Sequence, residues 1–314
     1  MARDPRQVQR QIGELLPFMA TPFAADGEID LPTLRRELRY LADECAQEPS
    51  CYFVCCGTGE FWSLSLEEFT HIVRAAVDEL GGRAPIVAGV GYGTRLALEF
   101  TRAAQAAGAD AVLVFPPYLV SAPQEGLYAH YAAIASATDR AVMIYNRDNA
   151  VFEPHTIAHL VEACPNVIGL KDGYGDLERL AEVRRRLGDG FLLMNGMPCA
   201  ELHAWDYCQA GIRPYSPSAI EFIPELAWAF DRALEAGDKA RVDRFVAGFY
   251  RPYMDLRGQV PGYGVALIKA GLALRGRPAG GVRAPLVDPS SEHVAELQAL
   301  ISRGLELSKA RAKS

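Results

Sequence analysis

The chain has 314 residues, of which half are hydrophobic and about a quarter are charged, which is typical of a globular protein with one large core or two modest ones. Lys and Arg number 32 against 39 Asp and Glu, so the net charge of −7 argues against a nucleic-acid partner. No segment has the length of a membrane-spanning helix, and residues 1–12 form a polar leader that is neither a signal peptide nor a membrane anchor. An anionic substrate would therefore need local positive charge.

The seven cysteines are scattered through apolar runs and include the adjacent pair Cys55 and Cys56. Their odd number and the lack of a CxxC spacing indicate reduced, mostly buried thiols rather than disulfides. The six histidines fall in helix-like segments without the spacing of metal ligands. We predict a cytoplasmic protein without a metal site.

Apolar segments with strand character alternate with segments of helical periodicity from the N-terminus to about residue 224. Residues Ser65 to Glu68 form a capping box that opens a helix, and Gly108 follows an alanine-rich helix where a left-handed C-cap is expected. The predicted strands cover residues 15–23, 51–56, 85–90, 111–115, 141–145, 167–171, 191–195 and 212–216. Further predicted helices cover residues 31–46, 94–107, 124–137, 155–163, 176–187 and 200–210.

About eight strands at intervals of roughly 20 to 35 residues are typical of a (β/α)8 barrel. We therefore predict an α/β fold in which residues 1–224 form a TIM barrel. Beyond Pro224 the alternation stops, and the predicted helices cover residues 225–236, 239–250, 264–274 and 293–310. Residues 225–314 are expected to form a C-terminal helical extension rather than a second independent domain.

Lys171 ends an apolar, β-branched run and is followed by an acid and a glycine. This pattern predicts a buried strand that carries one amine to its C-terminal end. A lysine at the mouth of an apolar sheet is partly desolvated, which favours the free amine, and a free amine can attack a ketone to form a Schiff base. A single lysine at a strand end is more often an ordinary surface residue, so the ends of the other strands carry the argument.

Those strand ends, which meet at one face of a barrel, form a coherent group. Gly57, Thr58 and Gly59 leave backbone N–H groups open beside a hydroxyl and can hold the carboxylate of an α-keto acid. Tyr145 ends the strand before that of Lys171, so its phenol should lie near the amine and can transfer protons.

Three further strand-end residues are candidate ligands of the substrate. Arg147 is a candidate cation for a second anionic group, although it can also orient hydroxyls or pair with Asp148. Asn195 and Ser216, at the ends of the last two strands, are candidates for the part of the pocket that sets specificity.

Several motifs, in this order, resemble the dihydrodipicolinate synthase and N-acetylneuraminate lyase superfamily of Schiff-base barrels: Thr21-Pro22-Phe23, Gly57 to Glu60, Gln124 to Leu127, Tyr145-Asn146 and Gly169 to Asp172. Within it, the 5-dehydro-4-deoxyglucarate dehydratases are the most similar group, through residues 57–61, 116–119, 145–150, 196–198 and 264–271. The resemblance runs from about Leu16 to Leu286.

The resemblance implies roles for the strand-end residues. Lys171 would be the Schiff-base lysine, Tyr145 the active-site phenol, and Gly57, Thr58 and Gly59 the cradle of the carboxylate beside the ketone. It also implies a small-molecule keto sugar acid as substrate, no metal or organic cofactor, and a homodimer or homotetramer.

Two departures separate the chain from synthase-type relatives, which have two threonines at Gly57-Thr58 and an intersubunit tyrosine where this chain has Leu119. They argue against an enzyme of lysine biosynthesis. Against the dehydratase pattern, residues 216–221 read Ser-Pro-Ser-Ala-Ile-Glu in place of a usual Ser-Ser-Ala-Val-Phe-Asn. This change leaves the contacts after the last strand open.

The expected reaction is the decarboxylating dehydration of 5-dehydro-4-deoxy-D-glucarate to 2,5-dioxopentanoate, carbon dioxide and water. One rival is an aldolase that cleaves a 2-keto-3-deoxy sugar acid with the same lysine, and another is a barrel that binds keto acids without catalysis. A third is a nucleotide-binding oxidoreductase, suggested by Gly89, Gly91 and Gly93 after a strand, although Thr94 stands where the third fingerprint glycine belongs. A tight grip of Arg147 on the departing carboxylate would hinder decarboxylation, so its role stays open.

Overall fold

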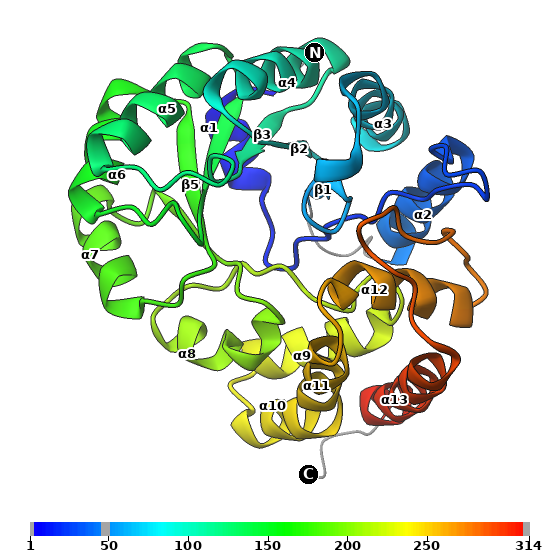
Figure 1. Ribbon diagram of the computed structural model, residues 1–314. Helices are drawn as coiled ribbons and strands as arrows, with labels where there is room; N and C mark the ends of the chain where they lie inside the picture. The colour runs from blue at the N-terminus through cyan, green and yellow to red at the C-terminus, as the bar shows by residue number, and fades with distance from the viewer. Residues whose placement is uncertain (1–2, 45–50, 310–314) are drawn as a thin grey trace.

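A computed structural model describes residues 3–44 and 51–309, and six of its strands form one parallel sheet in sequential order. Helices surround these strands (Figure 1). Nearly all strand residues are buried, because the sheet is covered on both faces, and this explains the continuous apolar runs of the sequence. The strands are β1 Tyr52–Val54, β2 Ile86–Val90, β3 Ala111–Val114, β4 Ala141–Asn146, β5 Val167–Asp172 and β6 Leu192–Asn195.

The first and last predicted strands are single bridges that close the barrel. Leu15 pairs with Tyr215, and Phe18 pairs with Phe53 of β1, both in parallel. Tyr215 also pairs with Asn195 at the end of β6. Both bridging segments contain prolines, which lack the N–H that a longer ladder needs. The predicted TIM barrel is confirmed, with two of its strands reduced to bridges.

The segment predicted as a polar leader contains a helix, α1 Pro5–Gln11, which lies against the strands (Figure 1). Asp4 caps this helix by accepting a hydrogen bond from the backbone N–H of Gln7 at 2.9 Å, and Pro5 suits its first turn. Val8 is buried among the side chains inside the barrel. The helix therefore fills the N-terminal end of the barrel, and the opposite end is left for a site.

The helices that follow the strands largely match the prediction, and both the Ser65–Glu68 capping box and the left-handed Gly108 are confirmed. The predicted helix over residues 200–210 is interrupted at His203. The end of the predicted helix 31–46 lies outside the described residues. The elements are α2 Leu31–Glu44, η1 Phe61–Ser63, α3 Leu66–Leu80, α4 Thr94–Ala107, α5 Gln124–Ser136, α6 Pro154–Ala163, α7 Leu177–Leu187, η2 Ala200–Leu202 and α8 Ala204–Gln209.

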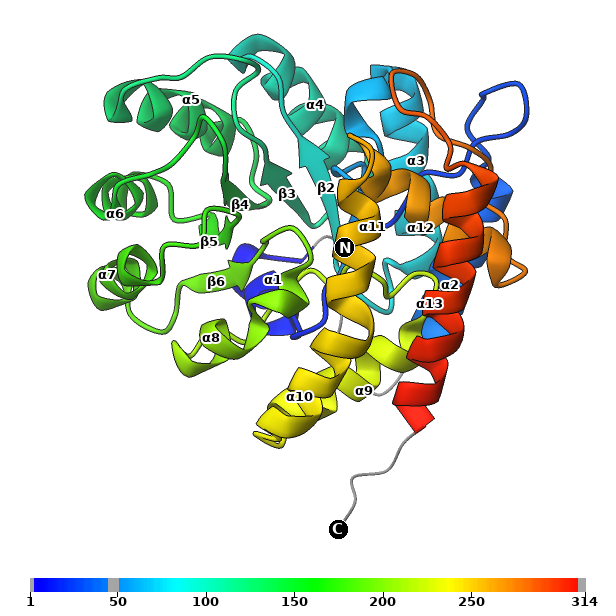
Figure 2. The same ribbon diagram turned by 60° about the horizontal axis from the view of Figure 1, so that its bottom comes forward.

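The C-terminal helices pack together beside the barrel (Figure 2) and share one hydrophobic core with it. The prediction missed α11. The chain continues from α10 through a π turn, and Pro252 is tolerated in the first turn of α11. The division at residue 224 stays a prediction. None of the described helices combines the length and hydrophobicity of a membrane span. The elements are α9 Pro224–Glu235, α10 Lys239–Phe245, η3 Val246–Tyr250, α11 Arg251–Gly258, α12 Tyr263–Leu274 and α13 Ser291–Lys309.

Candidate active site

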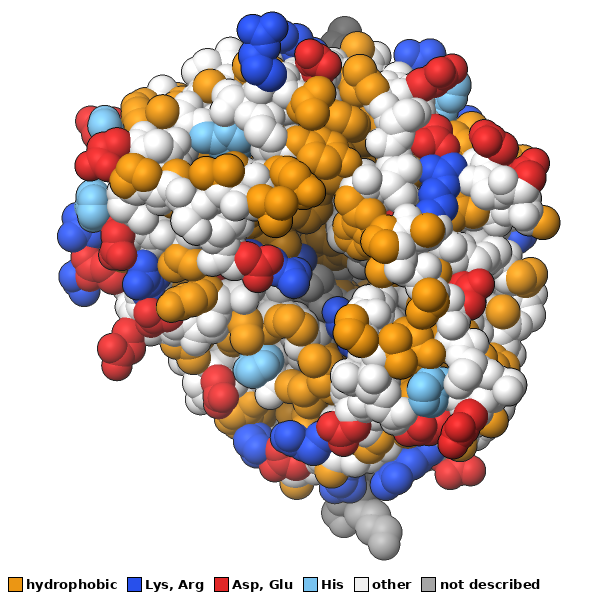
Figure 3. Space-filling model, viewed as in Figure 1, with side chains coloured by type: hydrophobic (Ala, Val, Ile, Leu, Met, Phe, Trp, Pro, Cys, Tyr) orange, Lys and Arg blue, Asp and Glu red, His pale blue; other side chains and the backbone are white. Residues whose placement is uncertain are grey.

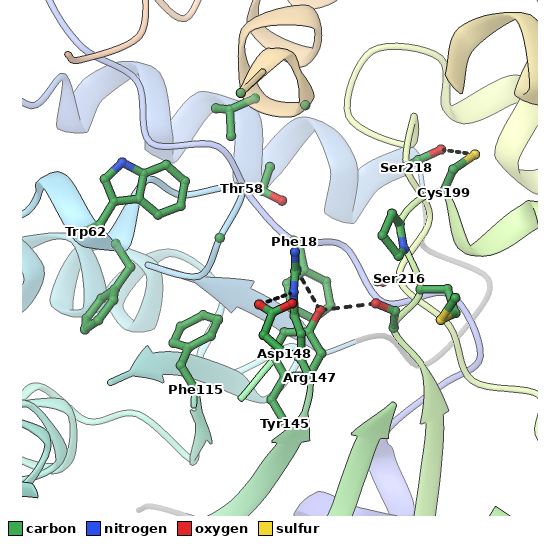
Figure 4. Close-up of a pocket in the computed structure, with 18 of the residues that line it drawn as sticks. Phe18, Thr58, Trp62, Phe115, Tyr145, Arg147, Asp148, Cys199, Ser216 and Ser218 are labelled. Atoms are coloured by element: carbon green, nitrogen blue, oxygen red, sulfur yellow. Dashed lines mark hydrogen bonds and ion pairs between the residues drawn. The ribbon is translucent and has the colours of Figure 1, made fainter. Parts of the chain in front are cut away.

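A cavity of about 970 Å³ opens at the carboxyl ends of the strands, and Figure 3 shows it as a hollow with Lys or Arg side chains near its mouth. Phe115 and Trp62 lie on one side of it, and Ser216 and Ser218 lie on the opposite side (Figure 4). The predicted site residues that line it are Gly57, Thr58, Tyr145, Arg147, Lys171 and Ser216; Gly59 and Asn195 do not.

Lys171 projects from β5 into this cavity and is only 6 % exposed. Its Nζ lies 4.0 Å from the centre of the Phe18 ring and 4.4 Å from the centre of the Tyr145 ring. Within the described part of the chain, the amine makes no hydrogen bond and no ion pair. It is therefore enclosed by aromatic faces and available to a ligand.

Tyr145 faces the amine because it is the register partner of Lys171 on the neighbouring strand β4. Its hydroxyl donates to the carbonyl of Gly196 at 3.2 Å and accepts from Nη1 of Arg147 at 3.2 Å. Nε of Arg147 donates to the carboxylate of Asp148 at 3.0 Å, and these side chains cluster at the end of β4 (Figure 4). Arg147 is thus held by Asp148 and by the phenol of Tyr145.

Gly196 follows β6 and shapes the space for the lysine. A Cβ at this position would lie 2.5 Å from both Cγ and Cε of Lys171, so any side chain would displace the reactive amine. The sequence shows this glycine only as part of the Gly196-Met197-Pro198 motif. Its contact with Lys171 depends on how β5 and β6 pair.

A buried ion pair between Glu60 and Lys269 of α12 fixes the loop after β1, residues Gly57 to Glu60. Oε1 of Glu60 accepts from Nζ of Lys269 in α12 at 2.6 Å, and Oε2 accepts from the backbone N–H of Arg283 at 2.9 Å. Burial lowers the pKa of Lys269, whereas Glu60 acts in the opposite direction. The carbonyl of Gly59 accepts the hydroxyl of Thr21 at 2.7 Å, so Gly59 shapes the loop and does not face the cavity.

Asn195 is buried, and its side chain is used by the local backbone. Its Nδ2 donates to the carbonyl of Ala200 at 3.0 Å, and its Oδ1 accepts from the N–H of Met197 at 3.1 Å. These bonds shape the turn that leads into η2. Its predicted contact with substrate stays a prediction that this geometry does not support.

Besides Asp148, two charged residues of the cavity were not among the predicted ligands. Arg257 in α11 packs against Gly264, where a Cβ would lie 2.8 Å from its Nη2, and it has no hydrogen bond or ion pair among the described residues. Glu221 is 4 % exposed; its Oε2 accepts from the N–H of Ala20 at 2.9 Å, and its Oε1 has no partner among those residues. Burial raises the pKa of Glu221 to about 8. The sequence flagged Glu221 only as a departure, and Arg257 lies in the helix that was missed.

A model of the dihydrodipicolinate synthetase family matches residues 11–304. The chain belongs to this family. A protein named probable 5-dehydro-4-deoxyglucarate dehydratase from Streptomyces griseus subsp. griseus is 46 % identical over 303 residues, which cover 95 % of this chain and 93 % of the relative. A protein with the same name from Bradyrhizobium sp. is 42 % identical over 298 residues, which cover 95 % and 94 %.

Solved structures of the dihydrodipicolinate synthetase family share the fold. The crystal structure of dihydrodipicolinate synthase from Bacillus clausii aligns with a TM-score of 0.83 at 30 % identity, over 95 % of this chain and 98 % of that chain. The enzyme of the same name from Oceanobacillus iheyensis aligns with a TM-score of 0.85 at 25 % identity and the same coverage.

The glycine run that suggested a nucleotide has a packing role in this family member. A Cβ on Gly89 would lie 2.4 Å from the carbonyl oxygen of Cys55, and one on Gly91 would meet the rings of Phe61 and Phe115. These glycines let neighbouring strands and aromatic side chains approach closely. The oxidoreductase reading therefore loses the feature that suggested it.

Proposed function

We propose that the chain is a lyase that converts 5-dehydro-4-deoxy-D-glucarate to 2,5-dioxopentanoate, carbon dioxide and water through a Schiff base on Lys171. One observation carries the proposal: an enclosed lysine amine, which has no hydrogen-bond or ion-pair partner among the described residues, faces the ring of Tyr145 in the cavity. The name printed for the similar proteins from Streptomyces and Bradyrhizobium supports the choice of substrate.

The substrate has a carboxylate at each end. Gly57 and Thr58 would hold the carboxylate beside the ketone, through backbone N–H groups and the threonine hydroxyl. Ser216, on the opposite side, would hydrogen-bond a substrate hydroxyl. Arg257 would recognise the far carboxylate when the substrate binds, because its guanidinium lacks a partner among the described residues, whereas that of Arg147 already contacts Tyr145 and Asp148. This carboxylate is C1, so the ion pair would have to loosen before carbon dioxide leaves.

The first half of the reaction is a dehydration. Lys171 attacks the C5 ketone, and loss of water from the carbinolamine gives an iminium ion that acidifies the C4–H bond. Tyr145 protonates the carbinolamine hydroxyl as it leaves, and the resulting phenolate, beside the cation of Arg147, then removes the C4 proton. The enamine electrons then form the C3–C4 double bond as the C3 hydroxyl leaves.

The second half is a decarboxylation. The conjugated iminium accepts the electron pair of the C1–C2 bond as carbon dioxide leaves, and the resulting dienamine is protonated on carbon. Hydrolysis frees the lysine and releases the product, with a net uptake of one proton for each substrate dianion. These steps call for neither a metal nor an organic cofactor.

The same proposal includes a cytoplasmic homodimer or homotetramer that binds no nucleic acid. Tyr118, Leu119 and Val120 form an apolar stretch beside the cavity with exposed fractions of 64 %, 83 % and 59 %, and a second subunit would cover such a surface. The described cysteines are free and mostly buried, which suits a reducing compartment. Light scattering of the purified protein would test the oligomeric state, and a monomer at micromolar concentration would contradict it.

The function is tested by mass spectrometry of the protein incubated with 5-dehydro-4-deoxy-D-glucarate and borohydride, with carbon dioxide release followed in parallel. An adduct on Lys171 together with carbon dioxide is expected, and Lys171→Ala should abolish both. An adduct without carbon dioxide would favour the aldolase. No adduct with any keto acid would overturn the Schiff-base mechanism.

A further inference from the structure

We propose that Glu221 is a catalytic acid whose carboxyl group protonates the hydroxyl that leaves from C3 of the substrate. The inference rests on the proposed dehydration and adds a residue for its hardest bond cleavage. Hydroxide is a poor leaving group, so a proton donor at the breaking C–O bond is worth about 100- to 10,000-fold in rate.

The contacts of Glu221 leave one carboxyl oxygen for a ligand. Only the backbone N–H of Ala20 bonds to its Oε2, and Oε1 has no partner within the described residues. A buried polar atom without a partner is rare and costs stability unless a bound molecule satisfies it. Oε1 is itself buried, but Glu221 lines the cavity, so a turn of its carboxyl group toward the cavity lets the substrate supply that partner.

The position of Glu221 brings it to the reacting end of the cavity. Ala20, its hydrogen-bond partner, lies two residues beyond Phe18 on the first bridging segment, and the Phe18 ring contacts the amine of Lys171. Glu221 itself follows the last bridging segment, after Tyr215. Both segments end at the face of the barrel that carries the lysine.

The surroundings of Glu221 favour the neutral acid. Burial raises its pKa to about 8, and the nearby carboxylate of Glu37 in α2 acts in the same direction. The N–H of Ala20 and the cations of Arg277 and Lys269 oppose this shift without cancelling it. A carboxyl group with such a pKa holds its proton near neutral pH and can still release it.

No other cavity residue fits this task as well. Tyr145 is already assigned to the C4 proton, and its hydroxyl is bonded to the carbonyl of Gly196 and to Arg147. The hydroxyls of Thr58 and Ser216 are too weakly acidic to protonate a leaving group. In the proposed step, the C3–O bond breaks toward oxygen, the Glu221 proton goes to that oxygen to form water, and solvent later reprotonates the glutamate.

Glu221→Gln is the decisive variant, because glutamine can still accept from the N–H of Ala20 but cannot donate a proton. In D2O, the variant should still form the imine and exchange the C4 hydrogens of recovered substrate for deuterium. Carbon dioxide release should fall by about 100- to 1,000-fold. A rate of carbon dioxide release within threefold of the wild type would overturn the proposal. So would a variant that loses both C4 exchange and carbon dioxide release.

The pH profile provides a readout that a purely structural role would not change. Wild-type kcat should decline above about pH 8, as Glu221 loses its proton, and the residual kcat of Glu221→Gln should lack this decline. Glu37→Gln, outside the cavity, should move the decline to lower pH, because removing that negative charge favours ionisation of Glu221. An unmoved decline in Glu37→Gln, or an identical one in Glu221→Gln, would contradict the assignment.

The two proposals fail in different ways. If the wild-type protein traps the imine yet releases no carbon dioxide, the proposed function fails whatever the variants do. If the wild type releases carbon dioxide and Glu221→Gln does so equally well, the function stands and the role of Glu221 fails.

Discussion

Each of two walls of the cavity contains a buried glutamate, and the two glutamates differ in how many of their carboxyl oxygens are hydrogen-bonded. The first wall is the loop Gly57 to Glu60, and the second wall is the segment Ser216 to Glu221 together with Arg257. Both oxygens of Glu60 are bonded, to Lys269 and to the N–H of Arg283. Glu221 has one bonded oxygen and one without a partner among the described residues.

This difference indicates a structural role for Glu60 and a chemical role for Glu221. A buried charge that is fully paired fixes the geometry of its loop, and it becomes costly only when its partner is removed. A buried carboxyl group in which one oxygen has no hydrogen-bond partner either stays protonated and neutral or binds a ligand. We infer that protein groups satisfy the polar atoms of the first wall, whereas the substrate satisfies those of the second wall. Four substitutions test this contrast.

The largest effect is expected from Lys269→Met in the first wall. It leaves the carboxylate of Glu60 buried without its counter-charge, so the free energy of unfolding at pH 7 should fall by about 3–5 kcal/mol. Urea denaturation measures this change. The double variant with Glu60→Gln should recover much of the loss, and a loss below about 1 kcal/mol for the single variant would show that the first wall is not held by this pair.

Glu221→Gln should have the next largest effect on stability, and with the opposite sign. The pKa of Glu221 is about 8 in the folded protein against an ordinary 4.5, so the folded state keeps a proton that the unfolded chain releases between these values. Wild-type stability therefore falls as pH rises through this window, by at most about 1.4 kcal/mol per pH unit. The variant should equal the wild type near pH 5 and exceed it by about 2–4 kcal/mol at pH 8.

Urea denaturation of both proteins from pH 5 to pH 8 measures this difference. A difference in the free energy of unfolding that does not change with pH would mean that Glu221 ionises normally and is not kept neutral by its surroundings.

Arg257→Met tests the cation of the second wall. Its effect should be limited to ligands with a far carboxylate, because the arginine has no described protein partner to lose. Imine trapping of 2-oxoadipate should need about 30- to 100-fold more ligand in the variant, about 2–3 kcal/mol, whereas trapping of 2-oxohexanoate should be unchanged. Arg251→Met, in the exposed first turn of the same helix, is the matched control. A preference for 2-oxoadipate that survives in Arg257→Met would contradict the assignment.

The smallest effect is expected from Glu68→Gln, at the edge of the first wall. Glu68 closes the capping box of α3 and pairs with Arg283, whose hydrogen bond is the main cause of the lowered pKa of Glu68, with burial opposing it. This stabilisation is present above the ordinary pKa of glutamate and is lost as pH falls below it. The variant should lose about 0.5–1.5 kcal/mol at pH 7 and less near pH 3, measured by thermal unfolding. An equal loss at both pH values would mean that the charge is not involved.

The pattern of residues along the chain was enough to predict the parallel barrel and the central pair of the site, Tyr145 and Lys171. Continuous apolar runs that alternate with amphipathic helices leave few other folds, and sequential parallel strands bring their ends to one edge. Tyr145 and Lys171 therefore had to meet, because each ends a neighbouring strand. Strand order does not predict the role of Asn195, because the turn that follows decides whether a strand-end amide hydrogen-bonds the backbone or a ligand.

Which polar groups have partners could be seen only in the folded chain. The pair of Glu60 and Lys269 joins residues 209 positions apart, and the fit of Gly196 to Lys171 follows from the spacing of two strands. Burial of Glu221 comes from several segments that pack around one carboxyl group, and Arg257 reaches the cavity on a helix that the sequence pattern did not reveal. Local periodicity records which residues face a core, whereas the pairing of charges depends on contacts between distant segments, which only the folded chain brings together.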